Sequence, residues 1–222
     1  MTERERLAVS AVCFDLDGTL LDTVPLIVES HQAALADYPE LANDVPFLVS
    51  TIGLPLEFVY NEKRFGPAAG ALMQRFIDHN VARTQTNIGI FRGIVPMLQG
   101  LKKLGLPLGL VTAKRRAHAV LAMELFDLVP YFDAVLGRED TKTHKPDPAP
   151  LREALRRLKV TDEKRLLYVG DSVHDLMAAA NLGCYSAAVA WSETPPDELL
   201  AQKPTLWLDH AVRLPDLVMP AE

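Results

Sequence analysis

Short apolar runs rich in valine, leucine and alanine recur along the chain. Each is about four to eight residues long and is bounded by glycine, proline or charge, which is typical of strands buried on both faces of a parallel sheet. The pattern therefore predicts five such strands, in the runs 7–14 (LAVSAVCF), 106–112 (LPLGLVT), 132–137 (FDAVLG), 165–171 (RLLYVGD) and 185–191 (YSAAVAW).

Helical patterns lie between these strands. Apolar residues recur at helical spacing in 95–105, 149–160 and 174–183, and the first of these segments ends at Gly105. Strands that alternate with helices predict crossover units, so we expect an α/β fold with a doubly wound, Rossmann-like parallel sheet. After about Pro195 the pattern predicts a last helix, a short strand and a closing helix.

One interval breaks this alternation. Between Asp22 and about Phe91 the pattern contains no parallel strand, only helical stretches such as 25–38 (PLIVESHQAALADY) and 69–84 (AGALMQRFIDHNVART). We therefore predict an α/β core domain from residues 1–22 and 92–222, with an all-helical cap domain inserted at 23–91. Ligands of open α/β sheets bind at the carboxyl ends of the strands, so an insertion directly after the first strand is expected to cover the site.

Composition narrows the classes of partner. The 222 residues are 49% apolar, enough for a proper core, and the formal net charge of −6 argues against a nucleic-acid-binding surface. Cys13 and Cys184 are far apart among apolar neighbours, which favours reduced core residues over a disulfide. The N-terminus lacks the pattern of an export signal, and the uncharged run 176–192 is interrupted too often to cross a membrane. We expect a cytoplasmic protein without a membrane or nucleic-acid partner; its oligomeric state, monomer or dimer, stays open.

Polar residues mark the predicted carboxyl ends of the strands. Several carboxylates at one sheet edge would repel one another unless a hard cation neutralised them, and Mg²⁺ prefers oxygen ligands, water and phosphate. A lysine there adds a charge for phosphate oxygens, while a threonine hydroxyl and the main-chain N–H groups at a helix start, beginning with Ala113, could bind an anion. The sequence thus predicts a phosphate site with a metal, built from Asp15, Asp17, Thr112, Ala113, Lys145, Asp171 and Asp175.

The spacing of the first two aspartates separates two chemical roles. Asp15 ends the strand, whereas Asp17 lies in the turn that Gly18 permits. An ionised Asp15 could attack phosphorus and form an aspartyl-phosphate, and the metal and Lys145 would offset the charge on the transferring group. Asp17 could protonate the leaving oxygen and then accept a proton from the attacking water.

These motifs resemble those of the haloacid-dehalogenase superfamily of phosphatases, in the branch with a helical cap after the first strand. The resemblance rests on DLDGTLLDT at 15–23, on Thr112, on KPDP at 145–148 and on GDSVHD at 170–175, in that order. It implies that Asp15 is the nucleophile, that Asp17 is the acid/base and supplies a main-chain carbonyl to the metal, and that Asp171 is a metal ligand. Thr112 and Lys145 would bind phosphate, and Asp175 would support the metal site from behind its ligands.

The substrate stays open at this stage. The resemblance favours a small phosphorylated metabolite such as phosphoglycolate, with inorganic pyrophosphate, a β-phosphoglucomutase-type reaction and a non-catalytic phosphometabolite-binding module as alternatives. The basic run 114–116 (KRR) could favour a doubly charged anion, although a solvated helix face is the simpler interpretation. In the cap, a loop around Gly53 is expected to approach the site, and Lys63 or Arg64 to meet the substrate or, more simply, solvent. None of the histidines is assigned chemistry, and Trp191 and Trp207 are interpreted as packing residues.

Overall fold

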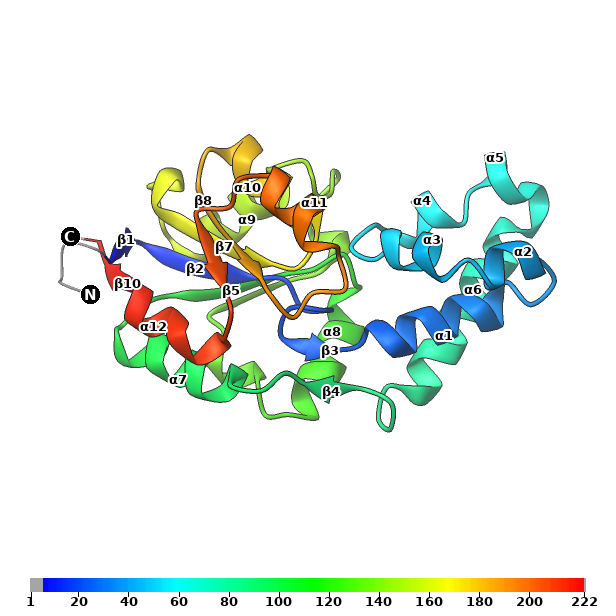
Figure 1. Ribbon diagram of the computed structural model, residues 1–222, viewed down its shortest axis with the longest axis horizontal. Coiled ribbons are helices and arrows are strands. Elements are labelled where there is room, and N and C mark those ends of the chain that lie inside the picture. The colour runs from blue at the N-terminus through cyan, green and yellow to red at the C-terminus, as the bar shows by residue number, and fades with distance from the viewer. Residues whose placement is uncertain (1–5, 222) are drawn as a thin grey trace.

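Six parallel strands form the central sheet, in the spatial order β6-β5-β2-β7-β8-β9. The computed structural model describes residues 6–221 (Figure 1). Of these six strands, the earliest in sequence is β2, which lies inside the sheet between β5 and β7. The predicted doubly wound α/β fold is confirmed. The strands are β2 (Ala11–Phe14), β5 (Leu108–Val111), β6 (Ala134–Leu136), β7 (Leu166–Gly170), β8 (Tyr185–Val189) and β9 (Leu206–Leu208).

The two faces of the sheet are buried under different helices. Successive side chains of a strand point to opposite faces, so Val12 and Phe14 join one apolar cluster while Ala11 and Cys13 join another. The first cluster is completed by α7 (Ile94–Lys103), α8 (Arg116–Glu124) and α12 (Leu214–Leu217), and the second by α9 (Ala149–Leu158) and α10 (Val173–Leu182). A further helix, α11 (Pro196–Ala201), packs against α10 through Leu199. Burial on both faces explains why these strands carry nearly continuous apolar runs.

The prediction of a single strand over 7–14 is wrong. The run is divided at Ser10, whose main-chain N–H donates to the Arg165 carbonyl at 2.8 Å. Only β2 continues in the central sheet, whereas β1 (Leu7–Val9) pairs in parallel with β10 (Val218–Pro220). The expected ending of helix, strand and helix is present as α11, β9 and α12, but β10 follows it and was not predicted.

The interval after β2 is helical, as predicted. It contains α1 (Val24–Ala34) and α6 (Ala69–Arg83), with four short helices between them: α2 (Pro39–Ala42), α3 (Val45–Ser50), α4 (Leu56–Val59) and α5 (Glu62–Phe65). These helices have an apolar cluster of their own. In Figure 1 they extend to one side of the sheet.

The helical segment joins the rest of the chain through two adjacent passages. There β3 (Leu21–Asp22) pairs with β4 (Gly89–Ile90) in a two-residue antiparallel ladder. The division into a core of 1–22 and 92–222 and a cap of 23–91 stays a prediction, and residues 1–5 and 222 lie outside the described residues. We keep the word cap for residues 23–91.

Both cysteines are free thiols. Cys13 is buried in β2, and burial raises the pKa of its thiol well above the ordinary value. Burial also raises the pKa of Cys184 to about 12. Within residues 6–221, no helix is long and apolar enough to cross a membrane.

Candidate active site

Three neighbouring strands deliver the predicted site residues to one edge of the sheet. Asp15 directly follows β2, Thr112 follows β5 and Asp171 follows β7, and both β5 and β7 pair with β2. The Asp15 main-chain N–H still donates to the Val169 carbonyl, at 2.9 Å, so the last ladder bond of β2 fixes where this carboxylate lies. All three side chains are buried.

Lys145 is the cation at the centre of the site. Its Nζ donates to Asp15 Oδ1 at 2.8 Å, to Asp175 Oδ1 at 2.6 Å and to the Tyr168 hydroxyl at 3.0 Å. Only 4% of Lys145 is exposed, so three acceptors from three elements take the place of water around one ammonium group. A residue that sequence analysis placed on phosphate is therefore also the counter-charge of the nucleophile candidate.

Burial and charge act in opposite directions on these groups. Desolvation of Asp15 raises the pKa of its carboxyl to about 7, although Lys145 acts to lower it. Desolvation would lower the pKa of Lys145, but Asp15 and Asp175 raise it well above the ordinary value. Lys145 is therefore charged over the whole range of physiological pH.

Asp175 is held by a capping box at the start of α10. The Ser172 hydroxyl donates to Asp175 Oδ2 at 2.6 Å, and the Asp175 main-chain N–H donates back to Ser172 Oγ at 3.3 Å. Burial would raise the pKa of Asp175, but Lys145 and the Ser172 hydrogen bonds lower it below the ordinary value. Asp175 is thus an ionised carboxylate whose oxygens already have donors.

Asp171 has a different environment. Among the described residues, its carboxylate accepts one side-chain hydrogen bond, from the Thr19 hydroxyl at 2.8 Å. Desolvation, together with the nearby charges of Asp175 and Asp15, raises the pKa of this carboxyl well above the ordinary value. The Gly18 backbone (φ +79°) lies so close to the Asp171 carboxylate that a Cβ at position 18 would overlap it, so the turn requires glycine here.

The donor set fits a hard cation. Asp15, Asp171 and Asp175 each offer a carboxylate oxygen, and these oxygens lie within 4.8 Å of one another. Asp171 is a buried carboxylate beside like charges, and within residues 6–221 no lysine or arginine forms an ion pair with it. A bound divalent ion would stabilise such an arrangement. The group is therefore consistent with a metal site.

Asp17 lies outside this buried group and faces a different cation. Its Oδ1 accepts hydrogen bonds from Lys114 Nζ at 2.6 Å and from the Thr23 hydroxyl at 2.8 Å. About an eighth of the Asp17 side chain is exposed, at 12%, against 5% of the Asp15 side chain, so Asp17 is the more accessible of the two carboxylates. The two aspartates are thus in two environments, as their spacing predicted.

The basic run 114–116 does not form one solvated helix face. Lys114 pairs with Asp17, Arg115 lines the pocket described below, and Arg116 pairs with Asp140 and is half exposed. The expected helix start at Thr112 is wrong as well, since α8 begins only at Arg116 and Ala113 lies in the loop before it. In that loop the Lys114 main-chain N–H donates to Thr112 Oγ1 at 3.2 Å.

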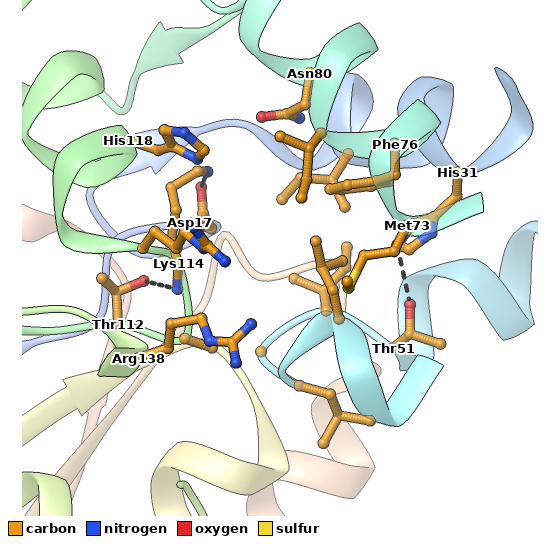
Figure 2. Close-up of a pocket in the computed structure, with 18 of the residues that line it drawn as sticks. Asp17, His31, Thr51, Met73, Phe76, Asn80, Thr112, Lys114, His118 and Arg138 are labelled. Carbon is orange, nitrogen blue, oxygen red and sulfur yellow. Dashed lines mark hydrogen bonds and ion pairs between the residues drawn. The ribbon is translucent and has the colours of Figure 1, made fainter. Parts of the chain in front are cut away.

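A pocket that is partly open to solvent joins these groups to the cap. Figure 2 shows Asp17, Thr112, Lys114, His118 and Arg138 on one side and cap side chains on the other. Asp15, Ala113 and Arg115 also line it. The candidate catalytic groups therefore open into a space that the cap covers.

Further contacts between cap and core lie beside this pocket. Arg138, in the turn after β6, forms an ion pair with Glu57 of α4. A Cβ on Gly53 would lie 3.4 Å from Ser172 Oγ, so the loop around Gly53 does approach the site, as expected. Lys63 and Arg64 do not line this pocket; Arg64 lies over the Phe47 ring, 4.6 Å from its centroid.

Sequence reasoning missed several supporting residues. Tyr168 donates to the Val111 carbonyl at 2.9 Å and also contacts Lys145, but as one aromatic residue in an apolar run it carried no signal. Thr19 and Thr23 lie beside the recognised aspartates, where a hydroxyl that binds a carboxylate could have been considered. Trp191 packs on Phe91, as interpreted, and its Nε1 also donates to the Thr19 carbonyl at 3.0 Å.

Comparison with known proteins identifies the family. The model of the haloacid dehalogenase-like hydrolase family matches residues 12–189, most of the chain. The protein belongs to this family. Membership in the haloacid dehalogenase-like hydrolases confirms the resemblance and makes the chain a phosphatase of this type.

Individual known proteins are similar to this chain over nearly its whole length. Pyrophosphatase PpaX of Bacillus velezensis is 33% identical over 201 residues, which is 90% of this chain and 92% of that protein. A predicted phosphatase of Clostridium acetobutylicum has a TM-score of 0.82 at 24% identity, covering 94% of this chain and 97% of that one. A predicted phosphoglycolate phosphatase of Haemophilus somnus has a TM-score of 0.81 at 22% identity, covering 93% and 96%. At such identities the two structures establish the fold alone.

We expect Asp171→Asn to stabilise the metal-free protein, and more so at high pH. The raised pKa of Asp171 means that the folded state penalises its charged form, so stability is lost as pH rises above the ordinary carboxyl value and through the raised one. Asparagine keeps an acceptor for Thr19 without the charge. Urea unfolding with a chelator should show a gain of about 1 kcal/mol or more at pH 8 and a smaller gain at pH 5.

Asp175→Asn is the matched control, because the pKa of Asp175 is lowered by its partners. This variant removes a charge that Lys145 requires, and it should destabilise the protein at both pH values. A gain in stability for Asp175→Asn, or a loss for Asp171→Asn, would contradict the distinction drawn between these two carboxylates.

Proposed function

We propose that this protein is a Mg²⁺-dependent phosphatase that hydrolyses a small phosphorylated substrate through an aspartyl-phosphate on Asp15. The observation that carries the proposal is the separation of the two aspartates. Both aspartates line the pocket, but Asp15 is buried against Lys145, whereas Asp17, two residues later, pairs with Lys114 and is partly exposed. Two carboxylates in two environments at one pocket suit a nucleophile and an acid/base.

Asp15 attacks the phosphorus atom through a carboxylate oxygen. A P–O bond forms to Asp15 as the bond to the leaving oxygen breaks, and water later cleaves the acyl-phosphate to release inorganic phosphate. The Lys145 ammonium, 2.8 Å from Asp15 Oδ1, is placed to offset negative charge on the transferring group. Burial of both groups strengthens this interaction because little water screens it.

Asp17 transfers the proton in each half-reaction. It donates a proton to the leaving oxygen in the first step and accepts one from the attacking water in the second. Thr23 orients the carboxylate by its hydrogen bond at 2.8 Å. Thr112 and the Ala113 main-chain N–H line the same pocket and would bind the phosphate oxygens together with Lys145.

Asp15, Asp171 and the Asp17 main-chain carbonyl would hold the Mg²⁺, with Asp175 supporting them. When bound, the ion would supply positive charge to the phosphoryl group. Asp175 contributes through Lys145 and Ser172, whose positions it fixes by hydrogen bonds of 2.6 Å each. In this proposal Asp175 supports the site from behind the ligands.

Inorganic pyrophosphate is the first substrate to test, ahead of phosphoglycolate. The relative from Bacillus velezensis, at 33% identity, is named a pyrophosphatase, whereas the likeness to a phosphoglycolate phosphatase, at 22%, supports only the fold. Lys114 and Arg138 line the pocket on the core side, where a second anionic group could meet them. Either substrate would supply such a group.

Asp15→Asn should reduce phosphate release from pyrophosphate by about 10³-fold or more, because the amide is a poor nucleophile. The assay would measure inorganic phosphate with Mg²⁺ over a panel of pyrophosphate, phosphoglycolate, sugar phosphates and nucleotides. Asp22→Asn changes an exposed aspartate of β3, seven residues after Asp15; it is the control and should keep full activity. Retained activity in Asp15→Asn would refute the role of Asp15 as the nucleophile. If the wild-type protein consumed a sugar phosphate without releasing phosphate, a mutase reaction would be favoured.

Removal of divalent ions should abolish hydrolysis, and added Mg²⁺ should restore it, because the buried carboxylates need a cation to bind a phosphate dianion. The measurement is phosphate release after dialysis against a chelator, followed by titration with MgCl₂. Undiminished hydrolysis in excess chelator would be incompatible with the metal assignment.

Lys114→Met should lower kcat/KM for pyrophosphate by about 10- to 100-fold, as expected for the loss of one charge-assisted hydrogen bond to the substrate. The Lys102→Met variant removes a lysine that pairs with Asp133 on the surface, and it should leave the kinetics unchanged. Equal kinetics for both variants would show that Lys114 does not contact the substrate.

A further inference from the structure

The cap side of the pocket is an apolar surface. We call it the cap wall and define it by Ile27, Ile52, Met73, Phe76, Ile77 and Val81, all of which line the pocket. Four of these residues lie on α6 at positions 73, 76, 77 and 81, spaced so that one face of the helix points at the pocket. Figure 2 shows Met73 and Phe76 opposite Lys114 and Arg138.

The cap wall lacks charge although the cap carries cations. Among the described residues, every lysine and arginine that lines the pocket comes from outside the cap: Lys114, Arg115 and Arg138. On α6, Arg75 pairs with Asp37 at 2.7 Å and Arg83 pairs with Glu29 at 2.9 Å, away from the wall. The sequence of α6 thus separates its charges from the face that covers the site.

The polar groups beside the cap wall are already engaged. His31 Nδ1 and the Tyr60 hydroxyl are 2.7 Å apart, and His31 Nε2 is 3.3 Å from Thr51 Oγ1. Burial lowers the pKa of His31 to about 4, so this ring is neutral at pH 7. Asn80 donates its amide to the Ser30 hydroxyl at 3.2 Å. None of these groups brings a positive charge to the pocket.

We propose that the cap wall is a subsite for an apolar organic group attached to the phosphate that Asp15 attacks. A phosphate or diphosphate ester of an apolar alcohol would place its charge among the core cations and its hydrocarbon against Met73, Phe76 and Ile77. The inference rests on the proposed phosphatase function and specifies the class of substrate. Inorganic pyrophosphate, as an all-polar ion, would leave the wall uncovered.

The pocket is continuous from the aspartates to the cap wall, and this continuity indicates what kind of molecule it binds. One space is lined by Asp15 and Asp17 at one end and by the cap wall at the other, so a single molecule can contact both ends. Its charged end must be the end at Asp15, because the lysines and arginines that line the pocket, as far as residues 6–221 show, lie on that side. Removing hydrocarbon from water against such a wall favours binding in proportion to the area buried.

The experiment is a chain-length series of methyl, butyl and hexyl phosphate, assayed for phosphate release by the full chain with Mg²⁺. We expect kcat/KM to rise by about 2- to 4-fold for each added methylene until the wall is covered. Binding of methylphosphonate and hexylphosphonate to Asp15→Asn by calorimetry gives a readout without turnover. The longer phosphonate should bind at least about 10-fold more tightly.

Met73→Gln tests the wall, since Met73 is half-buried and glutamine has a similar length. The hexyl-to-methyl ratio of kcat/KM should fall toward one in this variant. Leu41→Gln introduces the same side chain at a half-buried apolar cap residue outside the pocket and should keep the wild-type ratio. Val81→Asn provides a second wall variant at an exposed position, 37% accessible, where folding is at little risk.

The outcomes separate the two proposals. A flat series in the wild-type protein, or equal ratios in the Met73, Val81 and Leu41 variants, would overturn the subsite while leaving the phosphatase function standing. Failure of the wild-type protein to hydrolyse any phosphate of the series or the panel, together with equal binding of the two phosphonates, would overturn both. Loss of turnover with preferential binding of hexylphosphonate would retain the subsite and refute the phosphatase function.

Discussion

The structure depends on one buried ammonium group. A phosphatase of this type needs ionised carboxylates in a site from which water is excluded. Burying each carboxylate without a cationic partner would cost on the order of several kcal/mol of folding free energy. Lys145 meets two of them, Asp15 and Asp175, and Tyr168 supplies a further contact. The Lys145 ammonium group thereby joins the end of β2 to the start of α10, where Ser172 also binds Asp175. The same positive charge therefore stabilises the fold and positions the candidate catalytic groups.

Much of this arrangement could be predicted from the sequence because of the parallel sheet. Strands buried on both faces are nearly continuous in apolar residues, and the first polar residue after each one marks the sheet edge. That rule locates Asp15, Thr112 and Asp171 from the sequence alone. The helical interval between Asp22 and Phe91 was equally visible, since alternation stops there and helical spacing continues.

What could not be predicted depends on contacts between distant segments. The ladder of Leu7 with Val218 joins residues from the two ends of the chain, and the periodicity of 7–14 contains no sign of the division at Ser10. Lys114 looked like part of a solvated basic run, because its partner Asp17 is far away in sequence. The separation of charge from apolar surface on α6 is an ordinary amphipathic pattern until the position of the pocket shows which face covers it.

The pairing of β1 with β10 has a practical consequence for protein engineering. It brings the first and last described strands together at the end of the sheet away from the cap helices (Figure 1). A short linker from Pro220 to Leu7 would join the two strands directly, so a circularly permuted chain that begins in a surface loop elsewhere could keep the same ladder. A fusion partner or an immobilising tag attached at that end would leave the mouth of the pocket and the movement of substrates unobstructed.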